Sequence, residues 1–344
     1  MYRALRRRNL AALAIAAVLA VSCQSPVSAA RPVEIGMGVR MIFTPPDEVE
    51  RQFDLMAEMN IKLVRVDFDW SAIEGTQGQF DWSYTDRIVQ HANERNMRVL
   101  ALPTYTAQWA RPAGTTSHVP PLEVADFAVF VRAAATRYAP LGVRSWEIWN
   151  EPNSSDYWLP RPDVDRYSEL FRAAAGAIRE VDNSATLITG GLTRGTDTPD
   201  GRRISQTTFV EGLYRNGAAQ IADAIGVHPY SFPSLPSDYP GQVGGIADLP
   251  ALHALITRQG DGDKKIWITE FGAPTGSAPE AMSDRDQAAS LLQARRLAQS
   301  WDWAGPLVFY ELRDAGTDPY ELEQNFGVLR ADLTPKDAGI ALME

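Results

Sequence analysis

Hydrophobic and polar positions change their spacing repeatedly along the chain from residue 34 onward. Short runs of apolar and β-branched residues predict strands, and longer stretches with apolar residues at helical spacing predict amphipathic helices. The predicted strands span residues 35–41, 62–69, 98–103, 143–150, 186–190, 224–228, 265–269 and 306–310. The predicted helices span residues 46–59, 84–96, 123–138, 164–181, 206–216, 249–258 and 284–303, with a short closing helix near Ala338.

Strand–helix units that follow one another in this way predict a (β/α)8 barrel, also called a TIM barrel. Strands that alternate with helices pair in parallel through right-handed crossovers, and eight units favour a closed barrel over an open sheet. No Pro-, Gly- or Ser-rich linker interrupts the pattern, so residues 31–344 are predicted to form one domain. In this fold the active site lies at the carboxyl ends of the strands.

Two of these strand ends carry a glutamate. Predicted strand four ends in WEIWNEPN (146–153), which contains Glu151, and predicted strand seven is followed directly by Glu270. Both strands open on the same barrel mouth, so the two carboxyl groups are expected to converge. Hydrolysis of a glycosidic bond with retention needs two carboxyl groups about 5–5.5 Å apart. One of them protonates the leaving oxygen, and the other attacks the anomeric carbon.

Several segments of the chain resemble clan A of the glycoside hydrolases. The most specific is the Asn-Glu-Pro sequence around Glu151, combined with Glu270 on strand seven. Similar stretches are RVDFDWSAIE (65–74), GQFDW (78–82), VHPY (227–230), FGVL (326–329) and DLTPK (332–336). The resemblance covers nearly the whole chain from about residue 34, and it is nearest to family 39, with families 5 and 42 also similar.

This resemblance implies roles for three residues. Glu151 is expected to be the general acid/base and Glu270 the nucleophile, in a double displacement that retains the anomeric configuration. Asn150 is expected to hydrogen-bond the sugar hydroxyl next to the reacting carbon.

Strand alternation places Arg65 and Asp67 on the same face of predicted strand two. A guanidinium at this strand end can hold Glu270 ionised through charge-assisted hydrogen bonds. A purely structural Arg65–Asp67 pair is the alternative. Glu147 shares the strand face of Glu151, and a carboxylate so deep in a barrel needs a partner such as Arg65. We therefore interpret Glu147 as structural support.

Aromatic residues also gather at the strand ends. His228 and Tyr230 at strand six fit the clan pattern, in which Tyr230 donates a hydrogen bond to Glu270, and both are expected to bind substrate; a core histidine and a loop tyrosine are the alternative. Tyr310, at the end of strand eight, is expected to contact substrate. Four tryptophans lie where a sugar face can stack on a ring, although each could equally pack in the core. They are Trp70, Trp109, Trp149 and Trp158.

Two strand ends depart from one member family of the clan. Family 5 enzymes usually carry a histidine near the end of strand three and a tryptophan at the end of strand eight. Here strand three runs into Tyr105 and strand eight into Tyr310. These departures argue against family 5 proper and leave the sugar-binding subsite partly undefined.

The composition limits other functions. Hydrophobic residues make up 45% of the chain and charged residues 22%, as in ordinary globular proteins. The net charge of −10 argues against nucleic acid or an anionic membrane surface as a partner. The four histidines show no metal-ligand spacing and no Gly-rich phosphate loop follows a strand, so neither a metal nor a cofactor is expected.

The first thirty residues predict a signal peptide. Arginines near the N-terminus precede an apolar run over residues 10–21, which is shorter than the roughly 20 residues that span a bilayer. The single cysteine, Cys23, ends an AVSC sequence (20–23) that resembles a lipobox, so a lipid anchor on Cys23 is one alternative. Cleavage within residues 27–30 is the other. Either way, we expect a secreted protein or a cell-surface lipoprotein without a disulfide bond, stabilised by a large core.

The sequence therefore predicts an exported retaining glycosidase that acts on a polysaccharide or oligosaccharide. Xylan- or mannan-like glycans, an exopolysaccharide and the polysaccharide of the cell's own envelope are all compatible substrates. A non-catalytic carbohydrate-binding protein on the same fold is a second hypothesis, since fold does not determine function. A transglycosylase, which shares the site and differs in how water is excluded, is a third. The joint presence of both glutamates, Asn150 and Arg65 favours catalysis over binding alone.

Overall fold

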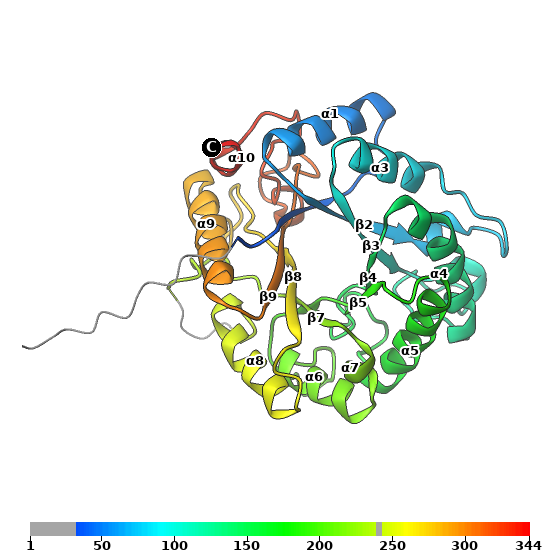
Figure 1. The fold of residues 1–344 in the computed structure, drawn as a ribbon. Coiled ribbons are helices and arrows are strands. Elements are labelled where there is room, and N and C mark those ends of the chain that lie inside the picture. Colours follow the sequence, from blue (N-terminus) through cyan, green and yellow to red (C-terminus); the bar gives the residue numbers. More distant parts are fainter. Residues whose placement is uncertain (1–31, 239–242) are drawn as a thin grey trace, which may run out of the picture. The chain divides into compact units, whose positions relative to one another are not determined.

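Eight parallel strands close into a barrel, with helices packed around its outside (Figure 1). Neighbouring strands pair in the order β1–β2–β3–β4–β5–β7–β8–β9, and β9 pairs with β1 to complete the ring. This arrangement confirms the predicted (β/α)8 barrel. The computed structural model describes residues 32–238 and 243–344, so the predicted signal peptide and Cys23 lie outside the described residues.

The strands and helices alternate as the hydrophobic pattern predicts. The barrel strands are β1 (Ile35–Val39), β2 (Leu63–Asp69), β3 (Arg98–Thr104), β4 (Ser145–Ile148), β5 (Thr186–Thr189), β7 (Ala224–His228), β8 (Lys265–Phe271) and β9 (Ala304–Phe309). The main helices are α1 (Pro46–Glu58), α3 (Ser83–Glu94), α4 (Val124–Tyr138), α5 (Val164–Val181), α6 (Gln206–Arg215), α8 (Leu249–Arg258), α9 (Asp284–Ser300) and α10 (Asp337–Met343). Within the described residues, no helix combines the length and the apolar character needed to cross a membrane.

Short elements in the loops were not predicted. The helices α2 (Trp70–Ile73) and α7 (Ala218–Ile221) each make about one turn, and β6 (Leu192–Thr193) pairs only with the upper end of β7. Such short segments contain too few residues to show a hydrophobic period. Helix starts follow ordinary capping chemistry: the side chains of Asp163, Ser205 and Ser283 accept backbone N–H groups at the beginnings of α5, α6 and α9.

Each strand buries both of its faces, which gives the molecule two hydrophobic layers. Inside the barrel, Leu63, Leu100, Ile188, Ala224, Trp267 and Val308 form one cluster below the mouth. The opposite faces of the same strands, such as Val64 and Val66 on β2, pack against the helices. Because side chains alternate along a strand, the face that carries Leu63 also carries Arg65 and Asp67 higher in the barrel. The inner apolar layer thus supports the polar residues at the mouth.

Candidate active site

A cavity of about 740 Å³ opens at the carboxyl ends of the strands. Its volume lies in the range of small-molecule sites. Of the residues singled out from the sequence, six line it: Arg65, Asn150, Glu151, Tyr230, Glu270 and Tyr310. Asp67, which strand alternation turned inward, also lines it. The predicted strand ends therefore do converge on one cavity.

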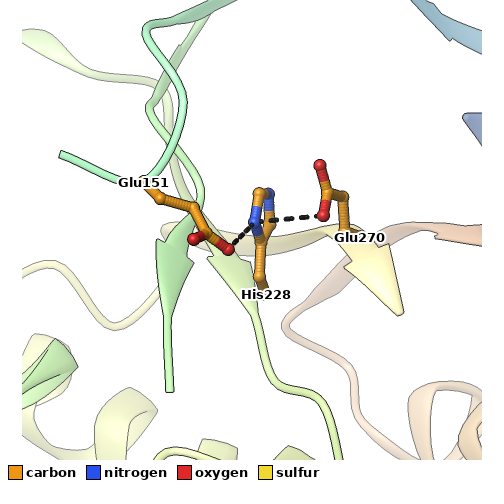
Figure 2. A group of neighbouring side chains, drawn as sticks. All are labelled: Glu151, His228 and Glu270. Carbon is orange, nitrogen blue, oxygen red and sulfur yellow. Dashed lines mark hydrogen bonds and ion pairs between the residues drawn. The ribbon is translucent and has the colours of Figure 1, made fainter. Parts of the chain in front are cut away.

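Glu151 and Glu270 meet at the floor of this cavity. One carboxylate oxygen of each and a ring nitrogen of His228 all lie within 4.8 Å of one another. Figure 2 shows the imidazole of His228 between the two carboxylates. Both glutamates are buried, with 8% and 7% of their surfaces exposed. A separation of this size brings both groups within reach of a single sugar ring, as a retaining mechanism requires.

An irregularity in β8 aims Glu270 into the barrel. Thr269 points inward, since its hydroxyl contacts both Glu147 and His228. Strict alternation would then turn Glu270 outward. However, the pairing of β8 with β9 shifts register between Ile268 and Phe271, so two consecutive side chains face the interior. This bulge places the carboxylate where sequence alternation alone would not.

The backbone beyond β4 is bent to present Glu151. Trp149 and Glu151 have φ angles of +70° and +42°, a region that side chains other than glycine rarely adopt. The bend is held by hydrogen bonds from Trp149 N to Pro103 O (3.0 Å) and from Glu151 N to Gly191 O (3.2 Å). Strained backbone of this kind persists where the surrounding structure determines it, and it often marks a functional site.

Arg65 connects the catalytic candidates through its guanidinium. Its Nε donates to Glu147 (2.6 Å), one terminal nitrogen donates to Glu270 (2.5 Å), and the other donates to Asn150 (3.0 Å). The interpretation of Glu147 as structural support for Arg65 is thereby confirmed. Asp67 lines the cavity, but among the described residues no hydrogen bond joins it to Arg65. Arg65 instead binds Glu147, Glu270 and Asn150, so the alternative of a purely structural Arg65–Asp67 pair does not hold.

His228 donates from both of its ring nitrogens. Its Nδ1 lies 2.8 Å from Glu151 Oε1 and 3.4 Å from Glu270 Oε2, and carboxylates accept hydrogen bonds. Its Nε2 lies 3.1 Å from the Thr269 hydroxyl, which gives its own proton to Glu147 and can therefore accept from the ring. The imidazole is thus held as a cation. Burial alone lowers the pKa of His228, but the charge of Glu270 and the bonds to Glu147 and Glu151 raise it to about 9.

The carboxyl groups of the site have distinct electrostatic environments. Burial raises the pKa of Glu151, and His228 opposes this through its hydrogen bond and charge, while the charge of Glu270 adds to it. For Glu147, burial also raises the pKa, but Arg65 and His228 outweigh it and bring the value to about 2. A group whose pKa is raised can hold a proton for transfer, whereas Glu147 stays ionised and anchors Arg65.

Tyr230 reaches Glu270 from β7. Its hydroxyl donates to Glu270 Oε2 at 2.6 Å, as the clan pattern implied, and its ring packs edge-on against Tyr310. Together with Arg65, it gives each oxygen of Glu270 a donor. Hydrogen bonds to a charged carboxylate are short and strong, and they hold the group in one orientation.

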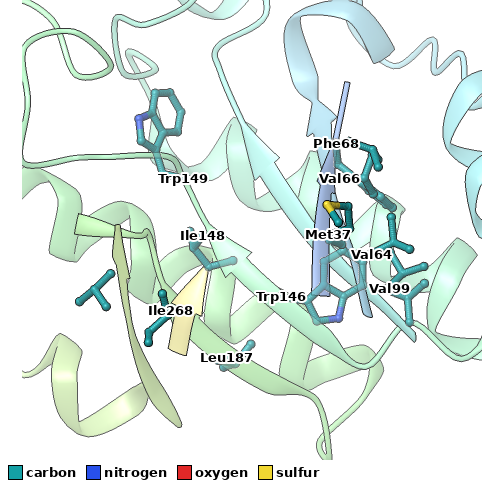
Figure 3. Close-up of a cluster of buried hydrophobic side chains, with 14 of the residues drawn as sticks. Met37, Val64, Val66, Phe68, Val99, Trp146, Ile148, Trp149, Leu187 and Ile268 are labelled. Atoms are coloured by element: carbon teal, nitrogen blue, oxygen red, sulfur yellow. The ribbon is translucent and has the colours of Figure 1, made fainter. Parts of the chain in front are cut away.

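None of the four tryptophans lines the cavity. Trp70, Trp149 and Trp158 are at most 1% exposed, so the prediction that they stack on substrate is wrong, and core packing holds instead. Figure 3 shows Trp149 among the buried side chains above Trp146 and Ile148. Trp109 is partly buried, packs edge-on against Trp70 and does not line the cavity. A position past a strand end does not decide whether a ring faces the sugar or the surrounding helices.

His228 also needs a correction. The expectation that it binds substrate is wrong, because its side chain is 0% exposed and does not line the cavity, and the alternative of a core histidine holds. Its Nδ1 instead faces the carboxylates of Glu151 and Glu270. It acts on the substrate only through these carboxylates.

The cavity wall contains residues that the sequence did not single out as binding residues. These are Gly38, Val39, Arg40, Tyr105, Asp156, Tyr157, Thr193, Arg194, Arg203, Phe232, Glu323 and Phe326. Most belong to loops, where no hydrophobic period indicates orientation. Arg40 follows β1 directly, so a systematic reading of every strand end would have found it. It binds Glu311 at 3.1 Å and Glu323 at 3.3 Å, and burial raises the pKa of Glu311 to about 8.

Glu151, His228 and Glu270 also form a group that has the spacing of metal ligands, although no metal was expected from the sequence. Their ligand atoms are already engaged with one another and with Arg65 and Tyr230. A cation bound there would lie beside the guanidinium of Arg65. The oxygen and nitrogen atoms of these three side chains therefore suit two carboxylates held by hydrogen bonds better than they suit a metal centre.

Comparisons with known proteins point to carbohydrate-active enzymes. A family model described as "Cellulase (glycosyl hydrolase family 5)" matches residues 30–305. No curated protein matches the sequence. A family 39 glycoside hydrolase from Bacteroides cellulosilyticus WH2 is 25% identical, with a TM-score of 0.73 over 91% of this chain and 63% of that one. The chain thus spans less than two thirds of that enzyme.

More distant structures share the fold. An exo-β-1,4-mannosidase from Opitutaceae bacterium strain TAV5 is 20% identical, with a TM-score of 0.62 over 91% of this chain and 59% of that one. A family 1 β-glucosidase from Thermotoga maritima is 15% identical, with a TM-score of 0.60 over 86% and 85%. These two structures share the barrel fold, and the family model confirms the resemblance to clan A. The departures at Tyr105 and Tyr310 had argued against family 5, and the family model shows that this argument is wrong. Two positions after strand ends weigh less than a match over most of the barrel.

Proposed function

The chain belongs to glycosyl hydrolase family 5 and is a retaining glycosidase of clan A, and on this premise we propose that Glu151 is its general acid/base and Glu270 its nucleophile. The observation that carries the assignment is the approach of the two carboxylates to within 4.8 Å of each other. Glu270 attacks the anomeric carbon while Glu151 protonates the leaving oxygen, and a glycosyl-enzyme forms. Glu151 then removes a proton from water, which releases the sugar with retained configuration.

The surroundings of each carboxylate suit its assigned role. Glu270 accepts from Arg65 and Tyr230, and these donors orient its charge toward the cavity. Glu151 has a raised pKa, which suits a group that must carry a proton into the reaction. One oxygen of Glu151 accepts from His228, which leaves the second to hold that proton. Asn150, fixed by Arg65 in the cavity wall, supports binding of the sugar hydroxyl next to the reacting carbon.

Chemical rescue with azide separates the two roles. We expect Glu151→Gln and Glu270→Gln each to lower kcat by about a thousandfold or more on a working glycan. In Glu270→Ala, azide can replace the missing nucleophile and give a glycosyl azide of inverted configuration. In Glu151→Ala, azide can attack the glycosyl-enzyme and give the retained product. Equal configurations from both variants, or near-normal turnover by either one, would contradict the assignment.

We further propose that the protein acts outside the cytoplasm on a polysaccharide or oligosaccharide. The support is the basic and apolar N-terminal segment, with Cys23 as a candidate lipid anchor. Intact mass of the protein purified from an expressing bacterium tests this. A mature chain that begins at Cys23 and carries a diacylglyceryl mass, lost in Cys23→Ser, supports anchoring. A chain that begins near residue 30 supports secretion, and retention of residues 1–30 would refute export.

A further inference from the structure

The side chain of Asp67 lines the cavity without a hydrogen-bond partner among the residues that the structure describes. Its backbone oxygen accepts a hydrogen bond from the hydroxyl of Tyr84, but nothing in the described part of the chain donates to its carboxylate. Arg65, on the same face of β2, gives its donors to three other side chains. Arg40, which also lines the cavity, is bound by two glutamates. The oxygens of Asp67 therefore remain for a ligand.

A carboxylate in this position lowers the stability of the fold. Burial raises the pKa of Asp67 to about 6, and the charge of Arg65 opposes this rise. The group is therefore mostly ionised at neutral pH, and an ionised carboxylate can only accept hydrogen bonds. The raised pKa also means that the charge destabilises the folded chain, because it leaves water without gaining a donor. Groups that reduce stability in this way are found where function needs them.

The geometry of β2 places Asp67 close to the reacting sugar. Asp67 lies two residues beyond Arg65 on the same strand face, which is about 7 Å nearer the mouth of the barrel. Arg65 binds Glu270, the proposed nucleophile, which must lie against the anomeric carbon. Arg65 also binds Asn150, whose proposed partner is the hydroxyl next to that carbon. Asp67 is thus left for a hydroxyl at another position of the same sugar.

Two tyrosines continue this side of the cavity. Tyr105 directly follows β3, which pairs with β2 along its whole length, and Tyr157 lies in the loop that follows β4. Both line the cavity, and neither hydroxyl has a hydrogen-bond partner within the described ranges. The ring of His118 contacts both tyrosines, with centroids 4.9 Å from Tyr105 and 5.3 Å from Tyr157. The strand ends from β2 to β4 thus present one acceptor and two hydroxyls to a ligand.

We propose that Asp67 accepts a hydrogen bond from a hydroxyl of the reacting sugar other than the one at C2, and that it selects sugars in which this hydroxyl is free over deoxygenated or O-acylated units. Tyr105 and Tyr157 are the neighbouring polar contacts. The inference rests on the proposed function, because Glu270 defines which sugar reacts. A hydrogen bond to an ionised group is stronger than one between neutral groups. A site built to bind a hydroxyl therefore rejects an analogue that lacks it.

Two isosteric substitutions on β2 separate recognition from stability. Hydrolysis by the wild type, Asp67→Asn and Asp69→Asn is measured on barley β-glucan, glucomannan, xylan and alginate. On the best substrate, we expect Asp67→Asn to lower kcat/KM about ten- to a hundredfold. Its urea midpoint near neutral pH should stay equal or rise, because the unpaired charge is gone. Asp69→Asn is the matched control: Asp69 does not line the cavity, and Asn caps α2 as well as Asp does, so kcat/KM should not change.

Deoxygenated substrates give a readout that a merely structural residue would not change. The probes are dinitrophenyl glycosides of the sugar in the best glycan, intact or with one hydroxyl at a time, other than the one at C2, replaced by hydrogen. In the wild type, we expect one of these replacements to lower kcat/KM about tenfold or more. In Asp67→Asn the same replacement should cause little further loss, because the acceptor is already altered.

Three results would overturn the inference. They are an unchanged kcat/KM in Asp67→Asn, a lower urea midpoint in this variant, and the lack of any deoxygenated probe whose penalty disappears in it. Wild-type hydrolysis of a glycan together with any of these results would leave the proposed glycosidase activity standing and remove only the role of Asp67. Absence of hydrolysis on every glycan would instead contradict the proposed function, and the inference would fall with it.

Discussion

Removal of one buried charge at Glu147 should destabilise the barrel by about 3 kcal/mol. Glu147 is 0% exposed, and its ordinary pKa of 4.5 falls to about 2 in the folded protein, because Arg65 and His228 outweigh the effect of burial. Since one pKa unit corresponds to about 1.4 kcal/mol, the ionised form contributes about 3 kcal/mol of folding free energy. Loss of one partner of a buried ion pair typically costs about 3–5 kcal/mol, which agrees.

The loss of stability in Glu147→Gln should depend on pH in one direction. A depressed carboxyl pKa stabilises the fold above pH 4.5, and the contribution is lost as the pH falls toward 2. The deficit of Glu147→Gln relative to the wild type should therefore be full near neutral pH. It should shrink below pH 4.5, because Glu147 of the unfolded wild-type chain then takes up a proton while the folded protein keeps it ionised until the pH nears 2.

Urea unfolding followed by tryptophan fluorescence, at several pH values between about 7 and 3, measures this difference. Glu180→Gln is the matched control: Glu180 pairs with Arg132 on the surface and is 65% exposed, so its loss should cost less than about 1 kcal/mol. If Glu147→Gln unfolds within 1 kcal/mol of the wild type at about pH 7, or if the deficit does not depend on pH, the electrostatic account of this network is refuted.

Two further predictions concern the residues behind the carboxylates. The pKa of His228 rises from 6.5 to about 9 on folding, so the charged imidazole contributes about 3 kcal/mol to the free energy of unfolding below pH 6.5, and this contribution is lost as the pH rises through 9. In urea unfolding, His228→Asn should therefore lose less stability than the wild type between pH 6.5 and 9. An equal loss in both proteins would contradict a charged imidazole. Gly191→Ala would place a methyl group onto His228 and Thr269, so it should destabilise the fold by about 1–3 kcal/mol and reduce turnover. Gly176→Ala, within α5 and with no atom within 4 Å of the added Cβ, is its control and should be neutral or stabilising.

The architecture could be predicted because it rests on local periodicity. Strands buried on both faces and helices with one apolar face leave a recurring pattern, and eight repeats of that pattern close only as a barrel. The same topology brought Arg65, Glu151 and Glu270 to one mouth, because the strand ends of a closed parallel barrel share an edge. The predicted bounds of α5, α8 and β7 agree with the structure residue for residue, since each is a long or strongly apolar segment with clear flanking signals.

Orientation at the mouth was decided only by tertiary structure. Glu270 points inward because β8 shifts its register against β9, and Glu151 points inward because the chain bends through a positive φ. Trp149 and Trp158 lie near the same strand ends yet pack into the core. Sequence determines which residues reach the mouth, because strand length and order are local properties. Which of them face the cavity, and what charge they meet there, depends on neighbours far along the chain, because bulges, bends and buried ion pairs form only when the barrel closes.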